Sequence, residues 1–239
     1  MNISIDDIKT NFEQIKIRVH DAAIKYGRNP DEITIVAVTK TQTANIIKAG
    51  IDAGITVFGE NYAQELKEKN DLLGGNAKKV QWHFIGHLQT NKVKFIIPFV
   101  NMIHSVDSHH LAEEISQQAQ KNNRTIEVLL QVNTSGEESK SGCVPGNIYT
   151  FAKDVINIPN LDVKGLMTIG SFTDDEIQIR KEFRMLRSIK DELNNNYGLI
   201  QFKHLSMGMT GDFEIAIEEG STFIRIGTAI FGQRDYSNL

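Results

Sequence analysis

The stretch ITIVAVTK at residues 33–40 decides the fold, because it is a short and nearly continuous run of apolar, β-branched residues that ends in a threonine and a lysine. Such a run is typical of a parallel strand that is buried on both faces. Seven comparable runs follow it along the chain, at 56–61, 80–86, 102–107, 126–133, 161–170, 202–209 and 223–232. The sequence therefore predicts eight strands, of which 33–40 is the first.

Amphipathic stretches separate the predicted strands. Apolar residues recur at helical spacing in seven segments, 43–53, 62–73, 89–98, 108–123, 145–157, 174–195 and 211–219. A further helix precedes the first strand, with Ser4 able to cap its beginning and Gly27 able to end it.

Strands that alternate with helices form βαβ units, and eight units in roughly 250 residues suit a (β/α)₈ barrel. The competing layout, a doubly wound open sheet, usually has fewer strands and a glycine-rich turn after the first one, which is missing here. We predict an α/β fold, a TIM barrel with an extra N-terminal helix, forming a single domain over residues 1–239.

Composition narrows the class of protein. The formal net charge is −4, whereas a chain built to bind nucleic acid is usually basic. The single cysteine, Cys143, cannot form an internal disulfide, and the histidines show no metal-ligand pattern with cysteine or acidic partners. No apolar run is long enough to cross a bilayer, and the N-terminus lacks the apolar core of a secretory signal. We expect a cytoplasmic protein without nucleic-acid, membrane or metal partners.

Lys40 is the candidate centre of a site, because the reactive residues of such barrels lie at the carboxyl ends of the strands. A half-buried lysine near another cation favours its neutral amine, which is the nucleophile that forms an imine with an aldehyde or ketone. The alternative is a lysine whose charged end simply reaches solvent at the end of a strand.

Glycine-rich turns late in the chain suggest a phosphate site. The segments SMGMTG (206–211) and RIGTAIFG (225–232) follow the last two predicted strands, where such barrels commonly bind phosphate. Ser206 and Thr228 offer hydroxyl donors, and Gly227 lets the backbone approach an anion. An amine and a phosphate site together fit a phosphorylated aldehyde, either pyridoxal 5′-phosphate or a sugar phosphate.

Arg225, two residues before Gly227, bears on this choice. A guanidinium only donates hydrogen bonds and stays charged, so against a pyridine nitrogen it would keep that nitrogen unprotonated. A phosphate clamp or a buried salt bridge is an equal alternative for this residue.

Ordered motifs run through nearly the whole chain: AVTKTQ (37–42), FGENYAQE (58–65), WHFIGHLQTNK (82–92), IHSVDS (103–108), QVNTSGEESKSG (131–142), GLMTIG (165–170) and LSMGMTGDFEIAIEEGSTFIRIGTAIFG (205–232). In sequence and order they resemble the pyridoxal 5′-phosphate homeostasis protein family, the single-domain relatives of the alanine racemase barrel. His87 departs from the family pattern, in which proline is frequent at that position.

The resemblance implies a barrel of fold type III that binds pyridoxal 5′-phosphate as a Schiff base on Lys40. It implies that Asn61 lies near the ring and the lysine, and that Arg225 faces the pyridine nitrogen. The remaining implied residues are Ser206, Gly227 and Thr228 at the phosphate with Met207 through its backbone, and Met167 and His204 in the wall of the pocket.

The resemblance also implies a role in cofactor homeostasis and supply without a settled catalytic reaction. Apoenzymes that depend on the cofactor are then possible recipients, and we expect a monomer. The first alternative is a racemase or related enzyme, which the expected lack of a second, β-rich domain disfavours. The second alternative is a cofactor-free aldolase acting on a sugar phosphate, which the placement of Arg225 disfavours.

Overall fold

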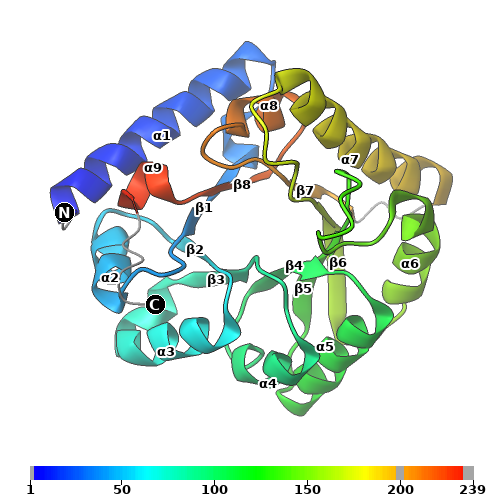
Figure 1. Ribbon diagram of the computed structural model, residues 1–239. Coiled ribbons are helices and arrows are strands. Elements are labelled where there is room, and N and C mark those ends of the chain that lie inside the picture. Colours follow the sequence, from blue (N-terminus) through cyan, green and yellow to red (C-terminus); the bar gives the residue numbers. More distant parts are fainter. Residues whose placement is uncertain (1–2, 198–201, 234–239) are drawn as a thin grey trace.

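The computed structural model describes residues 3–197 and 202–233, and in it eight parallel strands close into a barrel (Figure 1). Each strand pairs with the next along the chain, and the last returns to pair with the first. The strands are β1 (Thr34–Val38), β2 (Val57–Glu60), β3 (Gln81–Phe84), β4 (Met102–Val106), β5 (Ile126–Gln131), β6 (Leu161–Met167), β7 (His204–Ser206) and β8 (Phe223–Ile226). All of their carboxyl ends therefore meet at one rim.

Helices surround this barrel on the outside (Figure 1). They are α1 (Ile5–Lys25), α2 (Ala44–Asp52), α3 (Ala63–Leu73), α4 (Val93–Ile96), α5 (His109–Lys121), α6 (Ile148–Val155), α7 (Glu176–Tyr197), α8 (Phe213–Glu218) and α9 (Thr228–Phe231). The predicted barrel with an N-terminal helix is confirmed. Ser4 caps α1 as expected, because its hydroxyl accepts from the N–H of Asp7 while the Asp7 carboxylate accepts from the N–H of Ser4. α1 then packs against α8 and α9, which joins the two ends of the described chain.

Two of the predictions from the sequence are wrong near the rim. The predicted strand 223–232 ends at Ile226, because Gly227 leaves the extended conformation (φ −113°, ψ −81°) and residues 228–231 form α9 instead. The predicted helix 89–98 is a 3₁₀ turn over Thr90–Lys92 followed by the single turn α4. Ile97 keeps helical angles (φ −53°, ψ −35°), and Pro98 accounts for the early end because it has no N–H to continue the helical hydrogen bonds.

The apolar residues form two separate cores. The larger core lies between the sheet and the helices, with Trp82 and Phe58 among its largest buried members. The smaller core lies inside the barrel and consists of Val36, Val38, Val57, Ile85, Met102, Leu129, Met167 and Phe223. Because successive side chains of a strand point to opposite faces, Phe223 and Arg225 of β8 share the interior side while Ile224 joins the outer core.

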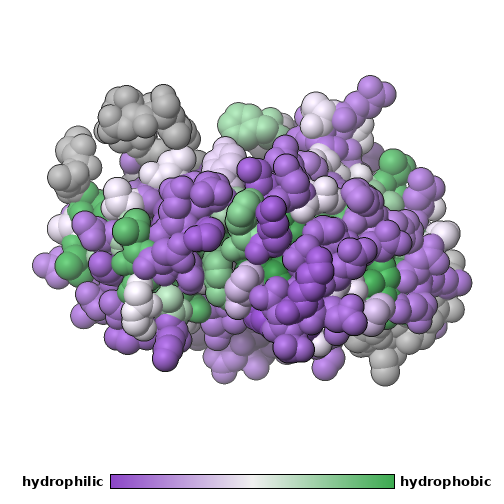
Figure 2. Space-filling model, turned by 90° about the horizontal axis from the view of Figure 1, so that it is seen from below, coloured by the Kyte–Doolittle hydropathy of each residue, from purple (hydrophilic) through white to green (hydrophobic). Residues whose placement is uncertain are grey.

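The outer surface is mainly hydrophilic on the side shown in Figure 2, where hydrophobic residues appear only in small, scattered groups. This is the side that is seen from below in Figure 1, near α3, α4 and α5. Among residues 3–197 and 202–233, no helix combines the length and the apolar character that crossing a bilayer requires.

The close approach of β6 to β7 yields a first prediction. A Cβ placed on Gly165 would lie 1.9 Å from the carbonyl oxygen of His204, a backbone atom that moves only if the two strands separate. The variant Gly165→Ala should lower the free energy of unfolding by about 1–3 kcal/mol or more through overpacking. The measurement is the urea midpoint.

The control is Gly75→Ala, because a Cβ at Gly75 would meet no atom of residues 3–197 and 202–233 within 4 Å. This variant should unfold at the midpoint of the parent protein or slightly above it. Equal midpoints for the two variants would contradict the packing explanation.

Candidate functional site

A cavity of about 560 Å³ opens at the rim where the strands end. Five of the nine residues predicted for the site line this cavity. They come from the segments that follow β1 and β2, from β8 and from the residues directly after β8. These five are Lys40, Asn61, Arg225, Gly227 and Thr228. The closed barrel thus joins residues from both ends of the sequence, as the rim prediction requires.

The other four predicted residues do not line this cavity. Met167 ends β6 and is buried in the inner core. Met207 is buried in the outer core, and its N–H donates to the carbonyl of Phe223 at 3.2 Å. His204 begins β7, away from the rim, where its Nδ1 lies 3.1 Å from the hydroxyl of Thr222.

Ser206, the last of these four, is fully buried at the end of β7. Its hydroxyl contacts Arg225 Nη1 at 2.8 Å and His104 Nδ1 at 2.9 Å. In this structure its oxygen therefore serves a network inside the barrel, whereas the sequence predicts a contact with phosphate. The roles of these four residues in ligand binding stay predictions.

Asn61 and Lys40 bring complementary chemistry to the cavity. Lys40 is half-buried and carries an amine, while Asn61 follows directly after β2. The side-chain oxygen of Asn61 is buried and has no hydrogen-bond partner among the described residues. An unsatisfied buried acceptor costs free energy. A ligand that donates to this oxygen would recover that cost.

Arg225 brings a buried positive charge to the cavity. Its guanidinium is 5 % exposed and donates to Ser206 Oγ at 2.8 Å and to the carbonyl of Thr168 at 2.9 Å. Burial lowers the pKa of Arg225 to about 10, and the nearby carboxylate of Asp212 acts in the opposite direction. Arg225 therefore remains a cation at neutral pH, and only neutral oxygen atoms accept its described hydrogen bonds.

A buried polar relay extends from Arg225 across the barrel interior. His104 Nδ1 lies 2.9 Å from Ser206 Oγ, and His104 Nε2 lies 2.9 Å from His83 Nδ1. Because the guanidinium only donates, the Ser206 hydroxyl is best used as a donor to His104, which then donates from Nε2 to His83. The relay thus fixes one tautomer at each histidine and holds Arg225 in place.

Both relay histidines are neutral. Burial lowers the pKa of His83 to about 3, with a smaller contribution from His204. Burial likewise places the pKa of His104 well below its ordinary value, reinforced by His83 and Arg225. The sequence analysis did not identify this relay. The signal that could have revealed it is the alternation along β3 and β4, which puts His83 on the same side as Ile85 and His104 on the same side as Met102.

The turn after β7 closes one side of the cavity. Gly208 has φ +92°, and a Cβ there would lie 2.5 Å from the Cβ of Ala216, so the turn requires glycine. The carboxylate of Asp212 accepts from the N–H of Met209 at 2.5 Å and fixes the next residues. Met209 and Asp212 both line the cavity.

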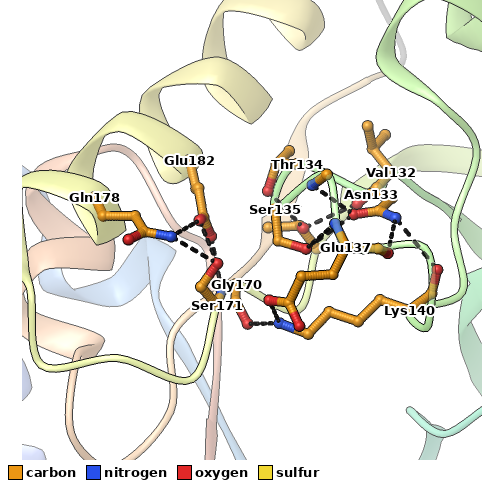
Figure 3. Close-up of polar contacts among 12 residues, drawn as sticks. Val132, Asn133, Thr134, Ser135, Glu137, Lys140, Gly170, Ser171, Gln178 and Glu182 are labelled. Carbon is orange, nitrogen blue, oxygen red and sulfur yellow. Dashed lines mark hydrogen bonds and ion pairs between the residues drawn. The ribbon is translucent and has the colours of Figure 1, made fainter.

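Two neighbouring loops fix the opposite side (Figure 3). Lys140 Nζ, from the loop after β5, donates to the carbonyl of Gly170 at 3.0 Å. Glu182 of α7 accepts from the N–H and the hydroxyl of Ser171, at 2.7 and 2.6 Å. The base of the loop after β6 is therefore firmly held, while the next residue, Phe172, is fully exposed at the cavity wall.

His87, the departure from the family pattern, lies at the same rim. Its side chain is 58 % exposed, and its Nδ1 is 3.2 Å from the hydroxyl of Ser141 and 3.6 Å from the carboxylate of Asp107. Within the described residues, no group of three or more histidine, cysteine or acidic side chains is placed to hold a metal ion.

The fold and the site define the class of barrel to which the chain belongs. Residues 3–235 match the alanine racemase, N-terminal domain family. An alanine racemase from Streptomyces coelicolor has the same fold, with a TM-score of 0.74 and 16 % identity over 97 % of this chain and 59 % of the racemase.

Full-length relatives are more specific. The pyridoxal phosphate homeostasis protein of Aquifex aeolicus is 42 % identical over 92 % of this chain and 95 % of the relative, and that of Escherichia coli is 38 % identical over 98 % and 99 %. The structure of PipY from Synechococcus elongatus with PLP bound has a TM-score of 0.82 and 28 % identity, covering 94 % of this chain and all of that one. The chain belongs to the pyridoxal phosphate homeostasis protein family.

The neutral histidines predict how stability depends on pH. Between pH 6.5 and about 3, the unfolded chain binds a proton at His83 that the folded barrel does not bind. The free energy of unfolding therefore falls as the pH drops through this window, by up to about 1.4 kcal/mol per pH unit. The variant His83→Gln should reduce the slope by about that amount in urea titrations between about pH 4 and 6.

The matched control is His20→Gln, which replaces a histidine on α1 whose side chain is 62 % exposed. The free energy of unfolding of this variant should depend on pH as steeply as that of the parent protein. An unchanged slope in His83→Gln would contradict the neutral relay.

Proposed function

We propose that this chain binds pyridoxal 5′-phosphate covalently through Lys40 and takes part in the homeostasis and supply of that cofactor. The observation that carries the proposal is the cavity in which one amine, one unsatisfied amide oxygen and one buried guanidinium come together. The names of the full-length relatives and the ligand of PipY support the same function.

The residues of the cavity fit this cofactor. When bound, the cofactor supplies an aldehyde, and a primary amine such as that of Lys40 is the side chain that bonds covalently to it. Asn61 offers its unpartnered oxygen to a polar ring substituent such as a hydroxyl group. Gly227 and Thr228 line the same cavity from the other end of the chain, and they offer a backbone N–H and a hydroxyl group to the phosphate.

Arg225 is the residue that favours a carrier over a strong catalyst. Facing the ring nitrogen, it would donate a hydrogen bond and leave that nitrogen unprotonated. A carboxylate at this place would stabilise a protonated ring and make it a strong electron sink. Arg225 is locked by Ser206 and Thr168, so its donors keep their direction.

The proposal extends to the oligomeric state, the compartment and the partners of the protein. We propose that the protein acts as a cytoplasmic monomer that passes the cofactor to apoenzymes. The exposed Phe172 and the half-exposed Met209 beside the cavity support transfer, because they are apolar surface that a recipient can contact next to the cofactor.

Racemisation is the alternative that the fold suggests. It requires two proton-transferring groups on opposite faces of the substrate carbon. Besides Lys40 and Arg225, the ionisable side chains that line the cavity are the carboxylates of Asp174, Glu176 and Asp212. Asp212 is already engaged by the backbone of Met209, which supports a carrier.

The variant Lys40→Ala tests the covalent attachment. The parent protein mixed with pyridoxal 5′-phosphate should develop a visible absorbance band, and borohydride followed by mass spectrometry should place the reduced adduct on Lys40. Lys40→Ala should lose both signals, because Lys40 is the one lysine among the described residues that line the cavity. The control Lys67→Ala, at a half-buried position on α3, should keep them.

Full retention of the band and the reducible adduct by Lys40→Ala would overturn the assignment. For the alternative function, the cofactor-loaded parent protein should give no saturable conversion of L-alanine to D-alanine. Steady turnover in that assay would favour the racemase over the carrier.

A further inference from the structure

A second lysine is buried on the outer side of the barrel wall, beside Lys40 in the fold. Lys69 of α3 is 4 % exposed, and its Nζ makes three short contacts. It donates at 2.6 Å to each of the carbonyl oxygen of Thr39, the carboxylate of Glu60 and the carboxylate of Glu65. Thr39 also donates its hydroxyl to Glu60 at 2.6 Å.

These contacts fix the peptide groups on both sides of Lys40. The carbonyl of Thr39, which belongs to the peptide before Lys40, accepts from Lys69. The N–H of Thr41, which belongs to the peptide after Lys40, donates to Glu65 at 2.5 Å. Because Glu65 and Lys69 are one helical turn apart and are themselves paired, α3 holds the backbone of Lys40 as a unit.

The contacts around Lys40 include two features that cost conformational or solvation free energy. Thr41 adopts φ +66°, a conformation that non-glycine residues rarely take. Glu60 is fully buried, and one of its oxygens has no partner among the described residues. Burial raises the pKa of Glu60 to about 7 although Lys69 and Thr39 act in the opposite direction. Strain and buried charge of this kind persist only where the surroundings enforce them, and they concentrate at functional sites.

We propose that Lys69, together with Glu60 and Glu65, is a positioning residue that directs the amine of Lys40 into the cavity. This inference rests on the proposed function, because it assigns Lys40 as the covalent attachment point. Lys69 acts only through the backbone and does not line the cavity. Its loss should therefore affect bonding to Lys40 and should spare the part of the site that binds the ring and the phosphate.

Two ligands separate these effects. Pyridoxal 5′-phosphate bonds to Lys40, whereas pyridoxine 5′-phosphate carries an alcohol in place of the aldehyde and occupies the cavity without a covalent bond. In Lys69→Met, which removes the ammonium but keeps an unbranched apolar chain, the Kd for the aldehyde should rise about tenfold or more, since small misplacements of a reacting group are expensive. The Kd for the alcohol should stay within about twofold of the parent.

The matched control is Lys67→Met, which removes a lysine of the same helix that is only half-buried and is paired with Asp71. It should leave both dissociation constants unchanged. A parallel rise of both constants in Lys69→Met would make Lys69 a merely structural residue and overturn the inference, as would a parent-like ratio of the two constants.

A gentler pair of variants covers the case in which Lys69→Met does not fold. Thr39→Val keeps the side-chain volume and the residues of the ion pairs, but it loses the hydroxyl that donates to Glu60. Thr39→Ser keeps this hydroxyl. Thr39→Val should weaken aldehyde binding severalfold and slow the formation of the borohydride-reducible adduct, and Thr39→Ser should behave like the parent. Identical behaviour of the two variants would overturn the inference.

Lys40→Ala keeps the two conclusions distinguishable. If this variant retains the adduct, the proposed function fails. If it loses the adduct while the Lys69 and Thr39 variants bind both ligands like the parent, the attachment to Lys40 stands and only its positioning by Lys69 fails.

Discussion

Pairing of the first strand with the last is the constraint on which the rest of the site depends. β1 and β8 run in register with Val36 opposite Arg225, so that the segment after β1 and the segment after β8 leave the barrel side by side. Lys40 and Thr228 therefore line one cavity although they lie near opposite ends of the chain. An open sheet with the same elements would leave these two strands at separate edges and would not form the site.

The barrel wall holds a buried cation on each side, and the two are stabilised differently. Arg225, inside, donates to a hydroxyl and a carbonyl, which leaves its charge available to a ligand in the cavity. Lys69, outside, donates to the carboxyl groups of Glu60 and Glu65, which hold it by direct ion-pair contacts. Burial of either charge is unfavourable unless the hydrogen bonds are satisfied. In the function proposed above, the inner cation would provide an electrostatic contact for the ligand, and the outer one would fix the geometry of Lys40.

These features support the proposal that the protein holds and supplies the cofactor. The relay of His83, His104 and Ser206 keeps Arg225 fixed, and its two histidines are not among the residues that line the cavity. The loops after β5 and β6 are pinned to each other, yet Phe172 stays fully exposed beside the cavity. A site that is rigid at its base and accessible at its mouth can bind tightly and still pass its ligand on.

The sequence by itself determined the eight strands and most of the helices between them, because these depend on local patterns of period two and period 3.6. The barrel that they imply then indicates the rim as the location of the site. It also singled out Lys40, through its position at the end of an apolar run. Only the tertiary structure decided that Ser206 bonds to Arg225 and His104, and that Lys69 lies behind Lys40. Those contacts join residues far apart in the chain, and no local pattern encodes a distance across a closed barrel.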